Sequence, residues 1–179
     1  MNVILACDEK YGIGLKNKIP WSCKEDMKHF KKTTFGEGDN VIIMGKNTYL
    51  SLGRPLEDRL NFVVSTTLKR EEMIPGFFLF ESFDHAYQSA VSINMEISKN
   101  STADVWVIGG AKLYDYVFSN YEIQKLYLTM IHSDFNCDTL LSSNTIEIIK
   151  NIEWYSNTEM KYDENNTIKC SLLLYDIKV

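Results

Sequence analysis

Short apolar runs separated by helix-like segments restrict the fold of this chain more than any other feature. Each run is rich in β-branched or aromatic residues and is short enough for one buried strand. Several of the segments between them carry apolar residues at three- and four-residue steps, which is typical of amphipathic helices. The expected strands are 2–7, 41–44, 60–64, 77–80, 104–108, 123–131 and 168–177, and the expected helices are 22–34, 46–52, 82–97 and 111–118.

This alternation predicts an α/β fold. Because strand–helix–strand connections are right-handed, they favour a mainly parallel, twisted central sheet with helices on both faces. After Asn151 the pattern becomes β-rich, with a turn expected at 163–166, which favours antiparallel strands at the C-terminal edge. The chain has 179 residues, of which 45% are hydrophobic, so we expect a single domain over 1–179 with about eight strands.

Charge and cysteine usage exclude several classes of protein. The net charge is −5 and the lysines are scattered, so we expect no nucleic-acid partner. No apolar run approaches the ~20 residues of a membrane span, and the first residues lack a basic leader. Cys7, Cys23, Cys137 and Cys170 form no CxxC pair and are accompanied by only three histidines, so we expect no metal site. We interpret the thiols as reduced and the compartment as the cytoplasm.

The predicted helix that starts at Ser22 carries a carboxylate in an unusual place. Ser22 and Glu25 match a capping box, in which each side chain satisfies a free backbone N–H of the first turn. Met27 and Phe30 give the helix an apolar face, and Asp26 lies at its edge. Two interpretations stay open. Asp26 is either a boundary residue whose tip reaches water, or an anionic anchor in a pocket for a cationic or donor-rich ligand.

Glycine, lysine and hydroxyl residues follow the ends of three predicted strands. In a parallel sheet, ligands bind beyond the carboxyl ends of the strands. Glycine allows close approach of a backbone, and a following helix N-terminus offers free N–H groups to an anion. The pattern favours a phosphate-rich ligand such as a dinucleotide, although ordinary strand-to-helix turns remain the alternative. The residues are Gly45, Lys46, Asn47 and Thr48, then Ser65 and Thr66, and then Gly109, Gly110, Ala111 and Lys112.

Two further features bear on function, and the first allows two interpretations. Arg54 and Arg59 are either solvated surface residues or a bidentate clamp for a substrate carboxylate. The loop over 8–20 is long for a compact domain, and loops of that length are usually functional.

Taken together, these motifs resemble the dihydrofolate reductase family over essentially the whole chain. Their order and spacing agree with the family, and the combination is far more specific than any one segment. The matching segments are Ile13–Gly14 with Asn17, Ile19–Trp21, Asp26 with Phe30, Val41–Thr48, Gly53–Leu56, Asp58–Arg59 with Asn61, Val107–Gly110 with Tyr114, and Leu126–Thr129.

The resemblance implies an NADPH-dependent oxidoreductase that reduces 7,8-dihydrofolate to tetrahydrofolate. A hydride would pass from the nicotinamide to pterin C6, and a proton would reach N5. Such an enzyme supports one-carbon metabolism and thymidylate synthesis and is an antifolate target. We expect it to act as a cytoplasmic monomer on its small-molecule substrate.

The same resemblance implies roles for residues of the substrate pocket. Asp26 would hold the pterin through a ring nitrogen and an amino group, and Thr129 would support Asp26 through its hydroxyl. Trp21 would fix an ordered water near the pterin. Arg59 would pair with the glutamate α-carboxylate of the substrate, and Arg54 would lie at the rim. The side chains expected to line the pocket are Leu5, Met27, Phe30, Leu52 and Ile108.

For the cofactor, the resemblance implies a site across the other strand ends. Lys46, Ser65 and Thr66 would receive the adenosine 2′-phosphate, which favours NADPH over NADH. The loop over 8–20 would be the lid that closes over the nicotinamide, and in this family the Gly-Gly peptide at 109–110 is typically cis. The expected cofactor-binding residues are Ala6, Ile13, Gly14, Asn17, Lys18, Gly45, Lys46, Asn47, Thr48, Ser65, Thr66, Gly109, Gly110, Ala111, Lys112, Leu113 and Tyr114.

Two other functions compete with this interpretation. A pyrimidine reductase of riboflavin biosynthesis would share the glycine pair and NADPH, but not the set Trp21, Asp26 and Thr129. A non-catalytic folate- or dinucleotide-binding module would be expected to lose the pocket acid or the glycine pair, and this chain has both.

Overall fold

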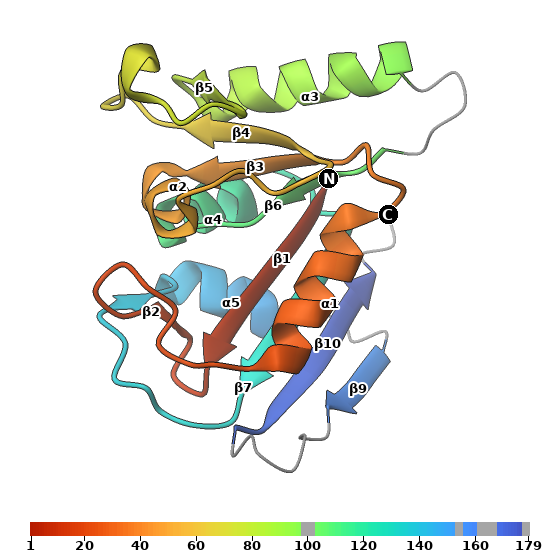
Figure 1. Cartoon of the computed structure of the whole chain (residues 1–179). Coiled ribbons are helices and arrows are strands. Elements are labelled where there is room, and N and C mark those ends of the chain that lie inside the picture. The colour runs from red at the N-terminus through yellow and green to blue at the C-terminus, as the bar shows by residue number, and fades with distance from the viewer. Residues whose placement is uncertain (98–102, 153–155, 161–167, 177–179) are drawn as a thin grey trace.

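The computed structural model describes residues 1–97, 103–152, 156–160 and 168–176, which form one large sheet with helices on both sides (Figure 1). The sheet has eight strands in the order β5-β4-β3-β6-β1-β7-β10-β9. Their bounds are β1 Asn2–Asp8, β3 Val41–Gly45, β4 Leu60–Val64, β5 Phe77–Phe80, β6 Val105–Val107, β7 Lys125–Ile131, β9 Ser156–Met160 and β10 Cys170–Asp176. Pairs from β5 through β7 are parallel, whereas β10 runs antiparallel to both β7 and β9. The predicted α/β class with an antiparallel C-terminal edge is confirmed.

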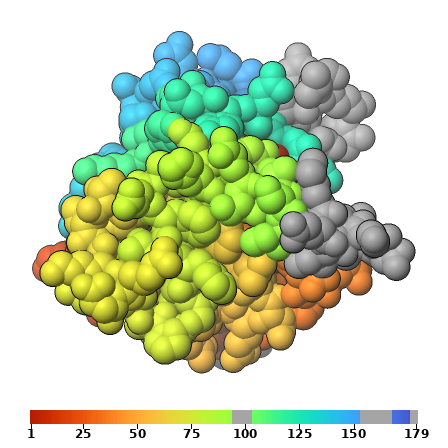
Figure 2. Space-filling view, turned by 90° about the horizontal axis from the view of Figure 1, so that it is seen from above, coloured from red at the N-terminus to blue at the C-terminus, as the bar shows by residue number. Residues whose placement is uncertain are grey.

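Within the described residues, five α-helices and one short 3-10 helix connect these strands. Figure 1 shows α1 on the near side of the sheet and α5 on the far side, while α3 covers the end that is seen from above in Figure 2. The helices are α1 Lys24–Phe35, α2 Lys46–Leu52, α3 Phe83–Ile97, α4 Ala111–Asn120 and α5 Ser143–Asn151, and the 3-10 helix is Arg70–Glu72. None of the helices in the described part of the chain is long and apolar enough to cross a membrane.

Alternate side chains of the central strands enter two different cores. Val3 and Leu5 of β1 lie in the cluster that includes the buried residues of α3, α4 and α5. Ile4 lies on the opposite face with Ile42 and Met44 of β3, where α1 and α2 contribute their apolar residues. This follows from the two-residue period of a strand, because neighbouring side chains point to opposite sides of the sheet. The helix α1, which carries Asp26, thus covers the same face of the sheet as α2.

The start of α1 differs from the predicted capping box. Cys23, not Ser22, is the N-cap residue, and no side chain bonds to the free N–H groups there. Glu25 instead contacts Lys28 at 2.6 Å. Trp21 and Cys23 are buried, so the chain enters the core just before the helix. Burying an aromatic side chain contributes about 2–3 kcal/mol, which exceeds the ~1 kcal/mol of a side-chain cap.

Besides the 3-10 helix, two short strands and one α-helix of the described residues were not predicted. The strand β2, Gly12–Gly14, pairs with β8, Thr139–Leu140, in a separate two-stranded sheet. The helix α5 begins after Ser142, whose side chain caps it, and buries Ile149 in the core. The strands β2 and β8 have only three and two residues, which is too few for a periodic pattern, and their pairing depends on contact between distant segments. The turn expected at 163–166 lies outside the described residues.

Asn40 joins two segments at the edge of the core and provides a test of the fold. The buried amide donates to the Thr34 carbonyl at 2.9 Å and accepts from the Asp104 backbone N–H at 2.7 Å. Asn40→Ala leaves both groups unsatisfied, so we expect the free energy of unfolding to fall by about 1–3 kcal/mol. Urea denaturation measures this change. The control Asn144→Ala, at an exposed site, should change it by less than about 0.5 kcal/mol; equal effects would contradict the role of Asn40.

Candidate active site

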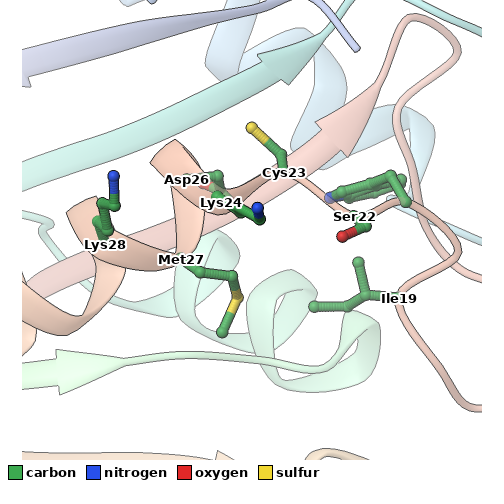
Figure 3. A pocket seen from close by; sticks show the side chains of 8 residues that line it. Ile19, Ser22, Cys23, Lys24, Asp26, Met27 and Lys28 are labelled. Atoms are coloured by element: carbon green, nitrogen blue, oxygen red, sulfur yellow. The ribbon is translucent and has the colours of Figure 1, made fainter. Parts of the chain in front are cut away.

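A pocket of about 370 Å³ opens beside the start of α1 (Figure 3). The loop before α1 and the first turns of this helix supply its described walls. Figure 3 shows Met27 and Ile19 at the pocket, and both side chains are largely exposed. The lining residues are Ile19, Trp21, Ser22, Cys23, Lys24, Asp26, Met27 and Lys28.

Asp26 is buried against this pocket and not solvated at a boundary. Only 8% of the residue is exposed. Burial raises the pKa of the Asp26 carboxyl above its ordinary value, and a hydrogen bond from the Thr129 hydroxyl lowers it in part. Among the residues that the structure describes, no lysine or arginine forms an ion pair with Asp26. Such a carboxylate is costly to the fold, and its free lone pairs can accept hydrogen bonds from a ligand.

Strand register explains why Thr129 meets Asp26. Thr129 of β7 lies opposite Ala6 of β1 in the parallel ladder and opposite Leu172 of β10 in the antiparallel one. Its side chain is almost fully buried and contacts Asp26 from the sheet side. The hydroxyl and the carboxylate, which are distant in the sequence, are thus brought together by the central strands.

Trp21 has a buried polar atom that no described group satisfies. Its ring packs edge-on against Phe135 at 5.4 Å between centroids. The indole Nε1–H has no hydrogen-bond partner among the described residues. A buried donor of this kind is rare, and an ordered water or a ligand atom would satisfy it. Trp106 has the same unsatisfied atom but packs within the apolar core against Tyr127.

Most of the expected substrate residues lie on the same side of the sheet as Asp26. Phe30, Leu52 and Ile108 pack around one cluster on the α1–α2 face, and Met27 lines the pocket. Leu5 is a correction, because its side chain points to the other face and packs with the α3–α5 core. Ile4 takes its place in the cluster of Phe30 and Leu52. The alternation of β1 shows that only one of these two neighbours can face Asp26.

The two expected arginines have different environments. Arg59 is half-buried and donates from Nη1 to the Thr34 hydroxyl at 2.8 Å and from Nε to the Glu57 carbonyl at 3.0 Å. Burial lowers the pKa of its guanidinium. Thr34 in turn donates to the Phe30 carbonyl, so Arg59 is fixed beside α1. Arg54 is exposed and lies just after α2.

Two glycine-bearing strand ends meet at the centre of the sheet. The Gly45 N–H donates to the Gly109 carbonyl at 2.7 Å, and the peptide between Gly109 and Gly110 is cis. Gly109 has a φ of +102°, and a Cβ there would lie 2.8 Å from the Tyr114 ring, so only glycine fits. Thr48 lies beside Gly110. Because α2 and α4 start here without side-chain caps, free N–H groups face this junction.

Beyond this junction, a lysine contacts a hydroxyl cluster. Lys46 donates from Nζ to the Thr67 hydroxyl at 2.9 Å. The Ser65 hydroxyl is nearly buried and accepts from the Thr67 and Leu68 backbone N–H groups. Thr66 is exposed and makes no contact with Lys46 that the structure records. Thr67 is therefore a candidate that sequence reasoning missed, although it stands in the same run of hydroxyl residues.

Among the remaining cofactor candidates, two groups differ in burial. Leu113 and Tyr114 of α4 are buried, and Tyr114 donates from its hydroxyl to the Ile4 carbonyl at 2.8 Å. Ala111 is half-buried, whereas Asn47 and Lys112 are exposed on the first turns of α2 and α4.

The expected lid is anchored at its base and turns sharply at its tip. Its base forms the small sheet of β2 and β8, which includes Ile13 and Gly14. At the tip, Leu15 and Lys18 exchange backbone hydrogen bonds, and Asn17 adopts a positive φ of 61°. The Lys16 N–H donates to the Asp138 carboxylate at 2.8 Å. The loop over 8–20 therefore ends in a solvent-exposed turn that is joined to the segment before β8.

Known proteins share both this sequence and this architecture. A family model described as Dihydrofolate reductase matches residues 1–176. The chain is 34% identical over 145 residues to a dihydrofolate reductase of Drosophila melanogaster, covering 77% of this chain and 76% of the relative. It is 30% identical over 186 residues to that of Rattus norvegicus, covering 99% and 97%.

One solved structure is similar in fold. It is a dihydrofolate reductase from Enterococcus faecalis complexed with NADP(H) and RAB-propyl. The TM-score is 0.79 with 24% sequence identity, and the match covers 98% of this chain and 94% of that one.

The buried carboxyl of Asp26 predicts a pH-dependent stability. Its pKa is raised on folding, so its ionisation costs stability as the pH rises from the unfolded value through the folded value. Asp26→Asn should therefore unfold at higher urea concentration than the wild type at pH 7, and this gain should disappear below pH ~4. Asp134→Asn is the control, because Lys10 holds the pKa of Asp134 below its usual range. A gain for Asp134→Asn, or none for Asp26→Asn, would refute this assignment.

Proposed function

The chain belongs to the dihydrofolate reductase family, and we propose that it performs the family's reaction with NADPH in the site around Asp26. Its enzymatic activity is that of a dihydrofolate reductase. NADPH supplies, when bound, the hydride that reaches C6 of the pterin. The observation that carries the site assignment is a buried carboxylate without an ion-pair partner among the described residues, beside a pocket.

Asp26 binds and orients the pterin. Its carboxylate accepts hydrogen bonds from a ring nitrogen and the amino group, and such charge-assisted bonds are about twice as strong as neutral ones. The Thr129 hydroxyl holds the carboxylate in place. The negative charge of Asp26 in a dry pocket favours a cationic pterin, which eases protonation at N5. This role is supported by the raised pKa of Asp26, because substrate binding then relieves an existing cost.

Water delivers the proton to N5 in this proposal. The pterin edge that binds Asp26 is remote from N5, so direct transfer from the carboxyl would be too long. The unsatisfied Nε1–H of Trp21 supports a water site, since this donor is buried and a water would complete its hydrogen bonding. Trp21 thus acts by holding the water at the pterin.

The tail of the substrate lies toward Arg59. Arg59 is fixed through Thr34 beside α1 and pairs with the α-carboxylate of the glutamate. Arg54 is exposed and lies at the rim. The aminobenzoyl ring packs on the apolar residues Phe30, Leu52 and Ile108.

The described residues fit a phosphate-rich cofactor. The close approach of Gly45 to Gly109 leaves no side chain at that junction, and the free N–H groups at the start of α4 suit a pyrophosphate. Lys46 with the hydroxyls of Ser65 and Thr67 suits the 2′-phosphate that distinguishes NADPH from NADH. The lid over 8–20 excludes water from the nicotinamide when it closes.

We also propose that residues 1–179 form a single domain that works as a cytoplasmic monomer. The described elements share one eight-stranded sheet, which supports a single domain. The four free cysteines support a reducing compartment. The family match favours dihydrofolate reduction over a riboflavin-pathway reductase or a non-catalytic binding module.

Removing the charge of Asp26 should reduce catalysis but not folding. We expect Asp26→Asn to lose about 10²-fold or more of kcat at pH 7 and to regain part of it in acid, where the substrate is already protonated. The decrease of NADPH absorbance with dihydrofolate measures this rate. Glu122→Gln is the control, because Glu122 is an exposed carboxylate between α4 and β7. Full activity of Asp26→Asn at pH 7 would remove Asp26 from the mechanism.

Lys46 should determine the preference for NADPH over NADH. We expect Lys46→Ala to raise the KM for NADPH about tenfold, since an ion pair with phosphate is worth roughly 1–2 kcal/mol, and to leave the KM for NADH nearly unchanged. Adding Ser65→Ala to Lys46→Ala should raise the KM for NADPH further. Lys125→Ala, at an exposed position at the start of β7, should change neither constant. Equal losses for both cofactors would refute the 2′-phosphate assignment.

A further inference from the structure

Two buried thiols from distant parts of the chain meet beside the candidate active site. Cys23 precedes α1 and Cys170 begins β10, and their sulfur atoms are 3.3 Å apart although 147 positions separate them in sequence. Either thiol can donate to the other. Both are free and buried, and together with Trp21 and Ile131 they form a small cluster of their own. The folded chain therefore holds two oxidisable thiols close to bonding distance.

The pair is coupled to the chemistry of the pocket. Cys23 lines the pocket and lies three residues before Asp26. Burial, the Cys23 thiol and the negative charges of Asp26 and Glu25 raise the pKa of the Cys170 thiol to about 12. Cys170 is therefore a protonated thiol at neutral pH. Figure 3 shows the Cys23 sulfur turned toward the strands and away from Met27 and Ile19.

We propose that Cys23 and Cys170 form a reversible disulfide when a small oxidant such as hydrogen peroxide reaches them, and that an occupied pocket protects them. The Cys23 thiol loses its proton, and the thiolate attacks one peroxide oxygen. The O–O bond breaks, Cys23 becomes a sulfenic acid, and hydroxide leaves. The proton from Cys23 converts this hydroxide to water. The Cys170 sulfur then attacks the sulfenic sulfur. The S–S bond forms, and the sulfenic oxygen leaves as water with the Cys170 proton. Two thiols are oxidised by two electrons and one peroxide is reduced to two waters.

Pocket occupancy controls this reaction because the sulfurs are not open to solvent. Only 5% of Cys23 and 2% of Cys170 are exposed, so the start of α1 must open briefly for peroxide to enter. A ligand that contacts Asp26 and Trp21 stabilises the closed state and makes such openings rarer. This part of the inference rests on the proposed substrate site.

The disulfide also restrains the connection between the lid and α1. Cys23 follows Ile19, near the end of the lid loop, and Trp21, and all three residues line the pocket. A covalent link from Cys23 to β10 fixes this segment to the sheet, whereas lid closure and product release require it to adjust. The oxidised enzyme therefore turns over more slowly, and reduction of the disulfide restores the rate.

The experiment treats the ligand-free full chain with hydrogen peroxide at neutral pH. We expect free thiols, counted after denaturation, to fall from four to two, and peptide mass spectrometry to identify a Cys23–Cys170 link. Turnover should fall by about threefold or more and should recover with dithiothreitol. Absence of the link, a link between other cysteines, or unchanged turnover of the linked protein would overturn the proposal.

Variants separate the pair from other oxidation. Cys170→Ser and Cys170→Ala should form no disulfide and should keep their own turnover after peroxide; two substitutions are used in case one fails to fold. Cys137→Ser is the matched control, because Cys137 packs against the same cluster, and this variant should still lose two thiols. Loss of turnover in the Cys170 variants equal to that of the wild type would show that the damage lies elsewhere and would overturn the proposal.

Folic acid tests the protection by an occupied pocket. It has the pterin head and glutamate tail of the substrate and resists peroxide. Its binding is measured separately by quenching of tryptophan fluorescence. With folic acid bound, we expect the disulfide to form at least about tenfold more slowly; an unchanged rate would overturn the protection. Failure of folic acid to bind would instead contradict the proposed function, while the disulfide of the ligand-free chain would stand.

Discussion

The carboxylate of Asp26, buried with a hydroxyl but without an ion-pair partner in the described part of the chain, is the constraint around which the site is built. Its charge disfavours folding, and the sheet tolerates it because Thr129 of β7 supplies one hydrogen bond. That hydroxyl is available only because β7 pairs in register with β1, beneath α1. Burial raises the pKa values of the nearby Tyr114 and Cys170 side chains, and the charge of Asp26 adds to both shifts. A ligand that donates hydrogen bonds to Asp26 therefore stabilises a charge that is poorly compensated in the ligand-free protein.

A second constraint is the close contact between two strand ends. The order of the sheet places β6 between β3 and β1, and β3 and β6 are parallel, so the turns at their carboxyl ends meet at the centre of the sheet. Gly45 and Gly109 form a direct backbone hydrogen bond there, and a side chain on Gly109 would collide with Tyr114. Tyr114 is itself tied to the Ile4 carbonyl. In the proposed site, this contact connects the cofactor side with the substrate side through one strand, β1.

The thiol pair adds a chemical sensitivity that the reductase reaction does not need. Cys23 lines the pocket, whereas Cys170 begins β10 in the antiparallel part of the sheet. Their contact links β10 to the segment that enters α1. In our proposal an oxidant acts on the enzyme beside the proposed substrate pocket.

Much of the fold was predictable from the sequence, because strand period, helix period and glycine position are local properties. These patterns gave the central strands, the helices α2 and α3 almost to the residue, and Asp26 as a carboxylate at an apolar edge. The family resemblance, now confirmed by the family match, gave the activity. The local patterns and the family resemblance also supplied the candidate site residues. The roles of these residues are still predictions.

The tertiary structure alone decided the rest. It placed Ile4 and not Leu5 on the face of Asp26, and it moved the start of α1 past Ser22 because burial of Trp21 and Cys23 outweighs a cap. It also brought Thr67 to Lys46 and Cys170 to Cys23. Each of these contacts joins residues far apart in sequence or selects between neighbours, and local propensity carries no information on either. Only the register and order of the strands fix which distant side chains share a space.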